Sequence, residues 1–142
     1  MTINARQKGK RIELEACSYL RSLGFRSVQR GQQFRGGAAS PDVKCADLPV
    51  IHFEIKGDES VRLGTQALVD ALWQSYEECD VWQYPVVLWK NNRTGWRLTF
   101  LAYGPAVTVT VCGDRDIGAA LRQLQEKAAI ITRITSNPSE GE

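Results

Sequence analysis

Hydrophobic residues with helical spacing mark three segments of the chain. In the first, over 8–23, they recur three or four positions apart and share one face of a helix, and Gly24 favours its end. The members of this apolar stripe are Ile12, Ala16, Leu20 and Leu23. Further helices are predicted over 63–79 and over 117–128, the last with Asp114 as its N-cap.

Strands fill the sequence between these helices. Short runs that alternate, or that are continuously apolar, predict three strands before the second helix and three after it. Their expected ranges are 25–30, 42–46, 50–56, 84–91, 96–102 and 106–111. The order αβββαβββα predicts an α/β fold class in which helices flank one central mixed β-sheet.

The size and composition of the chain suit one globular domain. It has 142 residues, of which 43% are hydrophobic and 24% are charged, and we expect a domain over 1–135 and a flexible polar tail over 136–142. Neither an apolar run of about 18 residues nor the apolar core of a signal peptide is found, so we expect a cytoplasmic protein. The four cysteines fit no metal-finger spacing and are expected to be buried free thiols.

Positive charge is concentrated in two short segments, although the net charge is only +2. Before Glu13 the chain has four basic residues and no acidic one, and a second acid-free segment follows at 25–40. The basic residues of the two segments are Arg6, Lys8, Lys10, Arg11, Arg26, Arg30 and Arg35. Both segments fit contacts with phosphates, but taken alone a solvated surface is the simpler interpretation.

All four tryptophans lie between positions 73 and 96. Aromatic rings in a nucleic-acid-binding protein can stack on unpaired bases. Trp73, Trp89 and Trp96 lie in a predicted helix and two predicted strands, and core packing or a dimer interface is the favoured interpretation for the tryptophans.

The stretch SPDVKCADLPVIHFEIKG, at 40–57, combines apolar and charged residues in a predicted hairpin. Alternate side chains share a face of a strand, so His52, Glu54 and Lys56 are expected to point to one side of the second strand. The apolar residues between them point to the other side, where they join the core.

The register of this hairpin predicts a pair of carboxylates. A connection of three residues places Val43 opposite Phe53 and so matches the apolar residues on one face. On the other face it makes Asp42 a direct neighbour of Glu54. Two carboxylates so placed repel each other unless one is protonated or a cation lies between them. Pro41, which has no N–H to donate, fixes Asp42 at the start of its strand.

The residues on this face fit metal-assisted hydrolysis of a phosphodiester. Carboxylate and carbonyl oxygens are the ligands that Mg²⁺ prefers, and Lys56 follows Glu54 on the same face at about 7 Å along the strand. An ammonium at that distance reaches a water or a phosphate oxygen next to the cation. The alternative is a hairpin surface with an ordinary Glu–Lys pair, because D…E-x-K is a short pattern.

Glu13 lies at the edge of the apolar stripe of the first helix. A carboxylate flanked by apolar residues needs a partner. A cation held by Asp42 and Glu54 is one such partner, reached directly or through water. The alternative is an ion pair with Lys10 or Arg11.

The order of these motifs resembles the PD-(D/E)XK nuclease superfamily, and most closely the archaeal-type Holliday junction resolvases and their phage relatives. The resemblance rests on K-G-x-x-x-E, PD, E-x-K, the helix ALWQSYEEC and the segment YPVVLWKNNRTGW, which span about Lys8 to Leu98. It implies a restriction-endonuclease-like fold with a core at about 8–98 and leaves about 99–135 as a C-terminal extension.

The resemblance also implies a role for each matching residue. Asp42 and Glu54, with the backbone carbonyl of Ile55, would bind Mg²⁺, for which Mn²⁺ substitutes, and Glu13 would complete the acidic shell. Lys56 would assist the hydrolytic water. The residues that would hold phosphates are Lys8, Lys10, Arg11, Arg30 and Arg35. Two weaker candidates, of which the second also fits a solvated helix stripe, are Ser40 and Gln74.

These matches predict a Mg²⁺-dependent endonuclease that cuts branched DNA, namely four-way junctions. They imply a homodimer with no nucleotide cofactor and no membrane partner. Two alternatives stay open: a repair or restriction-type nuclease that acts on other DNA structures, and a DNA-binding module of the same fold without catalysis.

Overall fold

The computed structural model describes residues 2–31, 41–57, 61, 63–91, 94–102 and 107–136, and most of the predicted polar tail lies outside these ranges. The described residues form a helix, three strands, a helix, three strands and a helix, in that order along the chain. The helices are α1 (Thr2–Ser22), α2 (Gln66–Glu78) and α3 (Asp114–Ser136). The strands are β1 (Val28–Arg30), β2 (Val43–Cys45), β3 (Ile51–Lys56), β4 (Tyr84–Trp89), β5 (Arg97–Ala102) and β6 (Val107–Cys112).

The six strands form one mixed sheet in the order β1-β2-β3-β4-β5-β6. Neighbouring strands are antiparallel except β3 and β4, which run parallel. A parallel pair needs a crossover connection, and α2 supplies it between β3 and β4. The predicted α/β class, with helices flanking a mixed sheet, is therefore confirmed.

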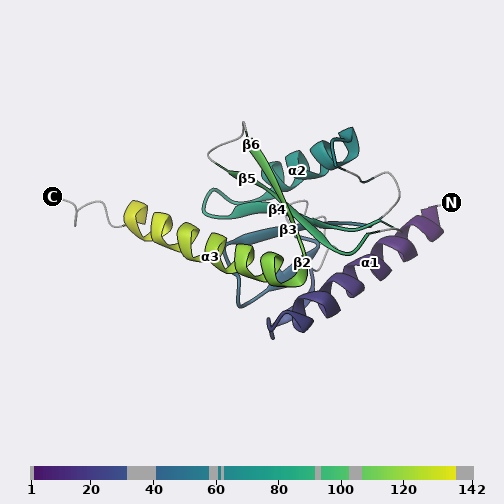
Figure 1. Cartoon of the computed structure of the whole chain (residues 1–142), viewed down its shortest axis with the longest axis horizontal. Helices are drawn as coiled ribbons and strands as arrows, with labels where there is room; N and C mark the ends of the chain where they lie inside the picture. The colour runs from purple at the N-terminus through teal and green to yellow at the C-terminus, as the bar shows by residue number, and fades with distance from the viewer. Residues whose placement is uncertain are drawn as a thin grey trace.

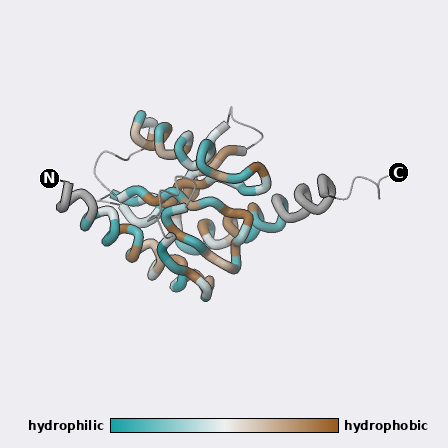
Figure 2. Tube along the Cα trace, turned by 180° about the vertical axis from the view of Figure 1, so that it is seen from behind, coloured by the Kyte–Doolittle hydropathy of each residue, from teal (hydrophilic) through white to brown (hydrophobic). Residues whose placement is uncertain are grey.

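The helices cover both faces of the sheet, with α1 and α3 on one face and α2 on the other (Figure 1). Successive side chains of the central strands point to opposite faces of the sheet, so each face has its own hydrophobic core. Phe53 and Val86 belong to the larger core under α1 and α3, whereas Val87 and Trp89 belong to the smaller core under α2. Hydrophobic residues accordingly line the central strands, and hydrophobic and hydrophilic residues alternate along the helices (Figure 2).

The C-terminal extension shares the larger core with the rest of the chain. β6 continues the sheet next to β5. Ile117 and Leu121 of α3 are fully buried in the same cluster as Leu20 of α1 and Phe53 of β3. The extension is therefore part of the same folded unit as the segment that carries the predicted motifs.

Two helices extend beyond the ranges that their apolar stripes predict. α1 begins at Thr2 and α3 continues to Ser136, because apolar spacing marks only the part of a helix that packs on the sheet. Asp114 is the first residue of α3 rather than its cap, and its carboxylate accepts a hydrogen bond from the Tyr19 hydroxyl at 2.9 Å. Within the described part of the chain, none of the helices has the length and apolar character that a membrane span needs.

The cysteines are all free, but they differ in burial from the sequence-based expectation. Cys17 and Cys45 are buried in the larger core, Cys79 is half-buried and Cys112 is exposed. The expectation of burial is wrong for Cys112, because β6 is an edge strand and this residue ends it.

Gly57 lets α1 approach the end of β3 closely. A β-carbon at this position would overlap the side chain of Ile12 in α1. Gly57 directly follows Lys56, the last residue of β3. The contact therefore fixes α1, which carries Glu13, against the strand that carries Glu54 and Lys56.

We expect Gly57→Ala to lower the free energy of unfolding by about 1–3 kcal/mol, because the added methyl group overpacks the Ile12 contact. Urea denaturation measures this change. Gly95→Ala is a matched control, because a β-carbon there meets nothing within 4 Å, and its effect should stay within about 0.5 kcal/mol. The close-contact interpretation is wrong if the two variants unfold alike, or if Gly57→Ala and Ile12→Ala add without coupling.

Candidate active site

The pairing of β2 with β3 has the predicted register. Val43 lies opposite Phe53, and the N–H of Asp42 donates to the Phe53 carbonyl at 3.1 Å. The N–H of Ile55 donates to Oδ2 of Asp42 at 2.9 Å. Asp42 therefore lies across from Glu54 at the start of β2, as the apolar matching of the hairpin predicts.

The backbone of Asp42 is fixed from both neighbouring strands. Its carbonyl accepts the N–H of Gly31 at 2.9 Å on the β1 side, and its own N–H is bonded to Phe53 of β3. Gly31 approaches Pro41 so closely that a β-carbon would overlap the Pro41 carbonyl oxygen. Because Gly31 has no side chain, its backbone can approach Pro41 closely enough to form the hydrogen bond that holds Asp42 in place.

The polar face of β3 is covered by α2 and reaches solvent at its end. His52 is fully buried, and its Nδ1 lies 3.1 Å from Oγ of Ser75 in α2. Glu54 is 3% exposed. The side chain of Lys56, at the end of the strand, is 37% exposed. The alternation of the strand thus places all three polar residues on one face, but α2 removes two of them from water.

Burial next to Asp42 raises the pKa of Glu54 to about 9. The largest cause is the removal of the carboxyl group from water, and the charge of Asp42 and a hydrogen bond to its carboxyl raise the pKa further. Lys56, whose Nζ lies 3.9 Å from Oε1 of Glu54, lowers the pKa but does not cancel these effects. In the absence of a bound cation, Glu54 is therefore protonated at neutral pH.

Glu13 is a second buried acid, but it has an internal counter-ion. Its Oε1 lies 2.8 Å from Nε of Arg30 in β1. Burial raises the pKa of Glu13, the hydrogen bond from Arg30 lowers it, and the charge of Asp42 raises it again. The effect of Asp42 indicates that α1 brings Glu13 toward the carboxylate pair. The partner of Glu13 is Arg30 rather than Lys10 or Arg11.

The pair of Asp42 and Glu54 fits a divalent cation. Oε2 of Glu54 is buried and has no hydrogen-bond partner among the described residues, which is a costly state for a carboxyl oxygen. No group of three or more His, Cys, Asp or Glu in the described ranges is close enough to hold a metal. Mg²⁺ commonly binds through one or two carboxylates and keeps several waters, so two carboxylates and the neighbouring Ile55 carbonyl suit it.

The predicted phosphate-binding residues are only partly available. Lys8, Lys10 and Arg11 are exposed on α1. Arg30 instead forms the ion pair with the buried glutamate of α1. Arg35 lies outside the described residues. Among the described residues, the predicted phosphate contacts that remain exposed are therefore the three basic residues of α1.

Gln74 is exposed on α2 and bonds to a neighbour on its own helix. Its Nε2 donates to Oε1 of Glu78 at 3.3 Å. Glu78 is a residue that the sequence reasoning missed, since its charge also raises the pKa of Glu54. Glu78 follows Ser75 by three positions on α2, and residues three apart share a helix face. Because Ser75 faces β3, this spacing could have identified Glu78 from the sequence. Ser40, the other weaker candidate, lies outside the described residues.

We expect the stability of the metal-free protein to fall as the pH rises from about 5 to 9. The folded protein keeps a proton on Glu54 up to a pKa of about 9, whereas the unfolded chain releases it near 4.5, so the unfolded state binds fewer protons between these values. Glu54→Gln should remove this dependence and be more stable than wild type at pH 8 by on the order of 2 kcal/mol. Urea denaturation in a chelator at pH 4.5 and 8 measures the difference.

Glu77→Gln is the matched control for this experiment, because Glu77 is an exposed acid on α2. It should follow the pH dependence of wild type. An identical pH dependence for wild type and Glu54→Gln would show that Glu54 is not held protonated by the fold.

Comparisons of the chain with protein-family models, curated proteins and solved structures found no match. Any functional assignment therefore depends on the chemistry that the fold gathers at this site. That chemistry consists of a buried carboxyl group next to a half-buried one, a half-buried lysine beside them and a glutamate–arginine pair on the adjoining elements.

Proposed function

We propose that the chain is a metal-dependent endonuclease that hydrolyses phosphodiester bonds in DNA on a restriction-endonuclease-like fold. The observation that carries this proposal is the buried carboxyl group of Glu54 next to the half-buried Asp42, with the ammonium of Lys56 beside it. A strongly raised acid pKa next to a like charge destabilises a fold, and such arrangements are concentrated at functional sites. Uncharged residues at positions 42 and 54 would serve a purely structural role better.

The residues that would hold Mg²⁺ or Mn²⁺ are Asp42, Glu54 and the backbone carbonyl of Ile55. Glu13, which is paired with Arg30, would contribute through water. When bound, the cation supplies Lewis-acid activation of the phosphoryl group and of a water molecule. Because Glu54 has to release its proton before it can act as a ligand, cation affinity should rise with pH.

Lys56 is placed to assist the reaction at the phosphate. Its Nζ lies 3.9 Å from Oε1 of Glu54 while its side chain is 37% exposed, so the ammonium can reach both the carboxylate pair and a bound substrate. It would donate hydrogen bonds to the attacking water or to a phosphate oxygen and offset the negative charge that develops there. In the hydrolysis, the water oxygen bonds to phosphorus, one phosphorus–oxygen ester bond breaks and the leaving oxygen takes a proton.

The proposed substrate is a four-way junction, and this choice follows from the resemblance of the motifs. A junction presents two equivalent strands, so we propose that two copies of the chain act together as a symmetric homodimer in the cytoplasm. Lys8, Lys10 and Arg11 would hold the phosphates of a duplex arm through charge, without reading its sequence.

We expect wild-type protein with Mg²⁺ to cut a labelled four-way junction in preference to linear duplex. Asp42→Asn and Lys56→Ala should each lower the rate by at least about 100-fold, because each removes a charged group from the reacting phosphate. The matched controls are Glu77→Gln and Lys127→Ala, which change exposed charges on α2 and α3 and should keep the wild-type rate. Gel analysis of the products measures all five proteins.

Each result separates the candidate functions. Equal cutting of junction and linear duplex would contradict the junction assignment and favour a repair or restriction-type nuclease. Binding without cutting would favour a non-catalytic DNA-binding module. If Asp42→Asn cuts as fast as wild type, the carboxylate pair is not the reaction centre.

Cation binding gives a readout that does not depend on cleavage. At pH 8, Mg²⁺ or Mn²⁺ at about ten times its Kd should stabilise wild-type protein by about 1.4 kcal/mol, which corresponds to a rise of a few degrees in Tm. Asp42→Asn should lose this rise, whereas Glu77→Gln should keep it. A potassium salt of equal ionic strength corrects for screening. A full rise in Asp42→Asn would place the cation elsewhere.

A further inference from the structure

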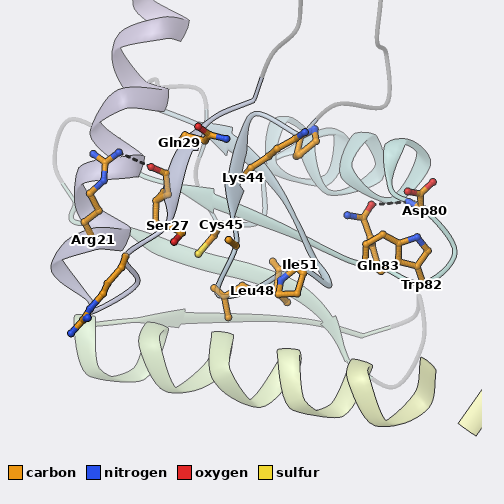
Figure 3. A pocket seen from close by; sticks show the side chains of 15 residues that line it. Arg21, Ser27, Gln29, Lys44, Cys45, Leu48, Ile51, Asp80, Trp82 and Gln83 are labelled. Carbon is orange, nitrogen blue, oxygen red and sulfur yellow. Dashed lines mark hydrogen bonds between the residues drawn. The ribbon is translucent and has the colours of Figure 1, made fainter. Parts of the chain in front are cut away.

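A groove next to the carboxylate pair has no part in the proposed hydrolysis. It has a volume of about 780 Å³, and its lining comes from the β1–β2 hairpin, the end of α1 and the connection from α2 to β4 (Figure 3). Pro41 is among the lining residues, and Asp42 follows it directly in the chain. The groove therefore adjoins the proposed reaction centre.

The lining of this groove is cationic. Arg21, Arg26 and Lys44 are set against a single acid, Asp80. Arg26 and Lys44 are exposed, and neither forms an ion pair within the part of the chain that the structure describes. Arg21 donates to the carbonyl of Val28 in β1 at 2.6 Å, which fixes its guanidinium at the wall of the groove (Figure 3). This excess of positive charge favours an anionic ligand.

Trp82 gives the groove an aromatic surface on the side opposite Arg21 (Figure 3). Trp82 is 44% exposed. Two hydrogen bonds between Asp80 and Gln83 close the turn that carries it. The N–H of Asp80 donates to Oε1 of Gln83 at 3.0 Å, and the N–H of Gln83 donates to the Asp80 carbonyl at 2.9 Å. An exposed indole on a backbone fixed in this way is suited to stacking on a flat ligand.

We propose that this groove binds unpaired nucleotides that continue from the DNA held at the carboxylate pair. Phosphates lie against Arg26 and Lys44, and a base stacks on Trp82. Cations that follow a sugar–phosphate backbone, together with an aromatic stacking platform, are the combination by which proteins bind single strands. A fully paired arm offers no free base to Trp82, and the volume of the groove lies in the range of pockets that enclose small organic ligands.

The inference rests on the proposed nuclease function for its biological meaning, and it makes the substrate class more specific. Within that class, the preferred substrate is a four-way junction with unpaired nucleotides at its crossover, next to the scissile phosphate. Pro41, Lys44 and the α2–β4 connection all line the groove, so the unpaired segment would leave the reaction centre through it.

The test is the binding of a fluorescein-labelled oligothymidine, followed by anisotropy in a chelator so that no cleavage occurs. Trp82→Ala should raise the Kd by about tenfold, as expected for the loss of one stacked base. Trp73→Ala is the matched control, since Trp73 is 47% exposed on α2 and does not line the groove. Lys44→Ala should reduce the slope of log Kd against log salt by about 0.7, while Lys127→Ala should leave it unchanged.

Two results would overturn the groove assignment. One is equal affinity of Trp82→Ala and Trp73→Ala for oligothymidine, with both variants retaining the wild-type circular dichroism spectrum and Tm. The other is an equal loss of affinity for blunt duplex and for oligothymidine in Trp82→Ala, which would mean that the groove holds paired backbone.

Failure of this inference can be distinguished from failure of the proposed function. Asp42→Asn should lose cleavage but bind oligothymidine like wild type. If wild type binds oligothymidine through Trp82 but cuts no DNA, the nuclease proposal is wrong and the groove assignment stands. If wild type cuts junctions while Trp82→Ala binds oligothymidine normally, the groove assignment alone is wrong.

Discussion

The register between β2 and β3 is the constraint on which the candidate site depends. Val43 and Phe53 lie opposite each other and are fully buried in the larger core, and burial of such side chains contributes about 1.5–3 kcal/mol each. A slip by one residue would turn both out of the core. The same register sets Asp42 against Glu54, so apolar packing on one face of the sheet holds together, on the other face, two carboxyl groups that would repel each other if both were ionised.

The crossover through α2 turns this pair into a chemically unusual site. Two carboxylates on an open hairpin would be screened by water and would perturb each other little. Because β3 and β4 are parallel, the connection between them has to pass over one face of the sheet, and α2 covers the polar face of β3 there. Glu54 thereby loses its hydration, and desolvation becomes the largest cause of its raised pKa. Topology, more than the choice of residues, raises the affinity of Glu54 for a proton.

Sequence periodicity predicted the sheet and the carboxylate pair well, because alternation and apolar matching are local properties of two adjacent strands. It could not predict which element covers a face, so it left open that α2 buries His52 and Glu54. The clustering of basic residues placed Arg30 among the phosphate contacts. The structure instead pairs it with Glu13, which joins β1 to α1 across 17 positions in the chain, and such a pairing leaves no periodic signal. The exposure of Trp82 was missed because this residue lies between a predicted helix and a predicted strand, where no periodic pattern indicates a face, and tryptophan is highly buried on average.

The two buried acids are neutralised in different ways. Glu13 is compensated by a counter-ion, since the guanidinium of Arg30 lies 2.8 Å from its carboxylate. Glu54 has the ammonium of Lys56 at 3.9 Å, on a side chain that is more than one-third exposed, and it stays neutral by keeping its proton beside Asp42. Natural sequences depart from local consistency of this kind mainly at functional sites, and we propose that a bound cation takes the place of this proton.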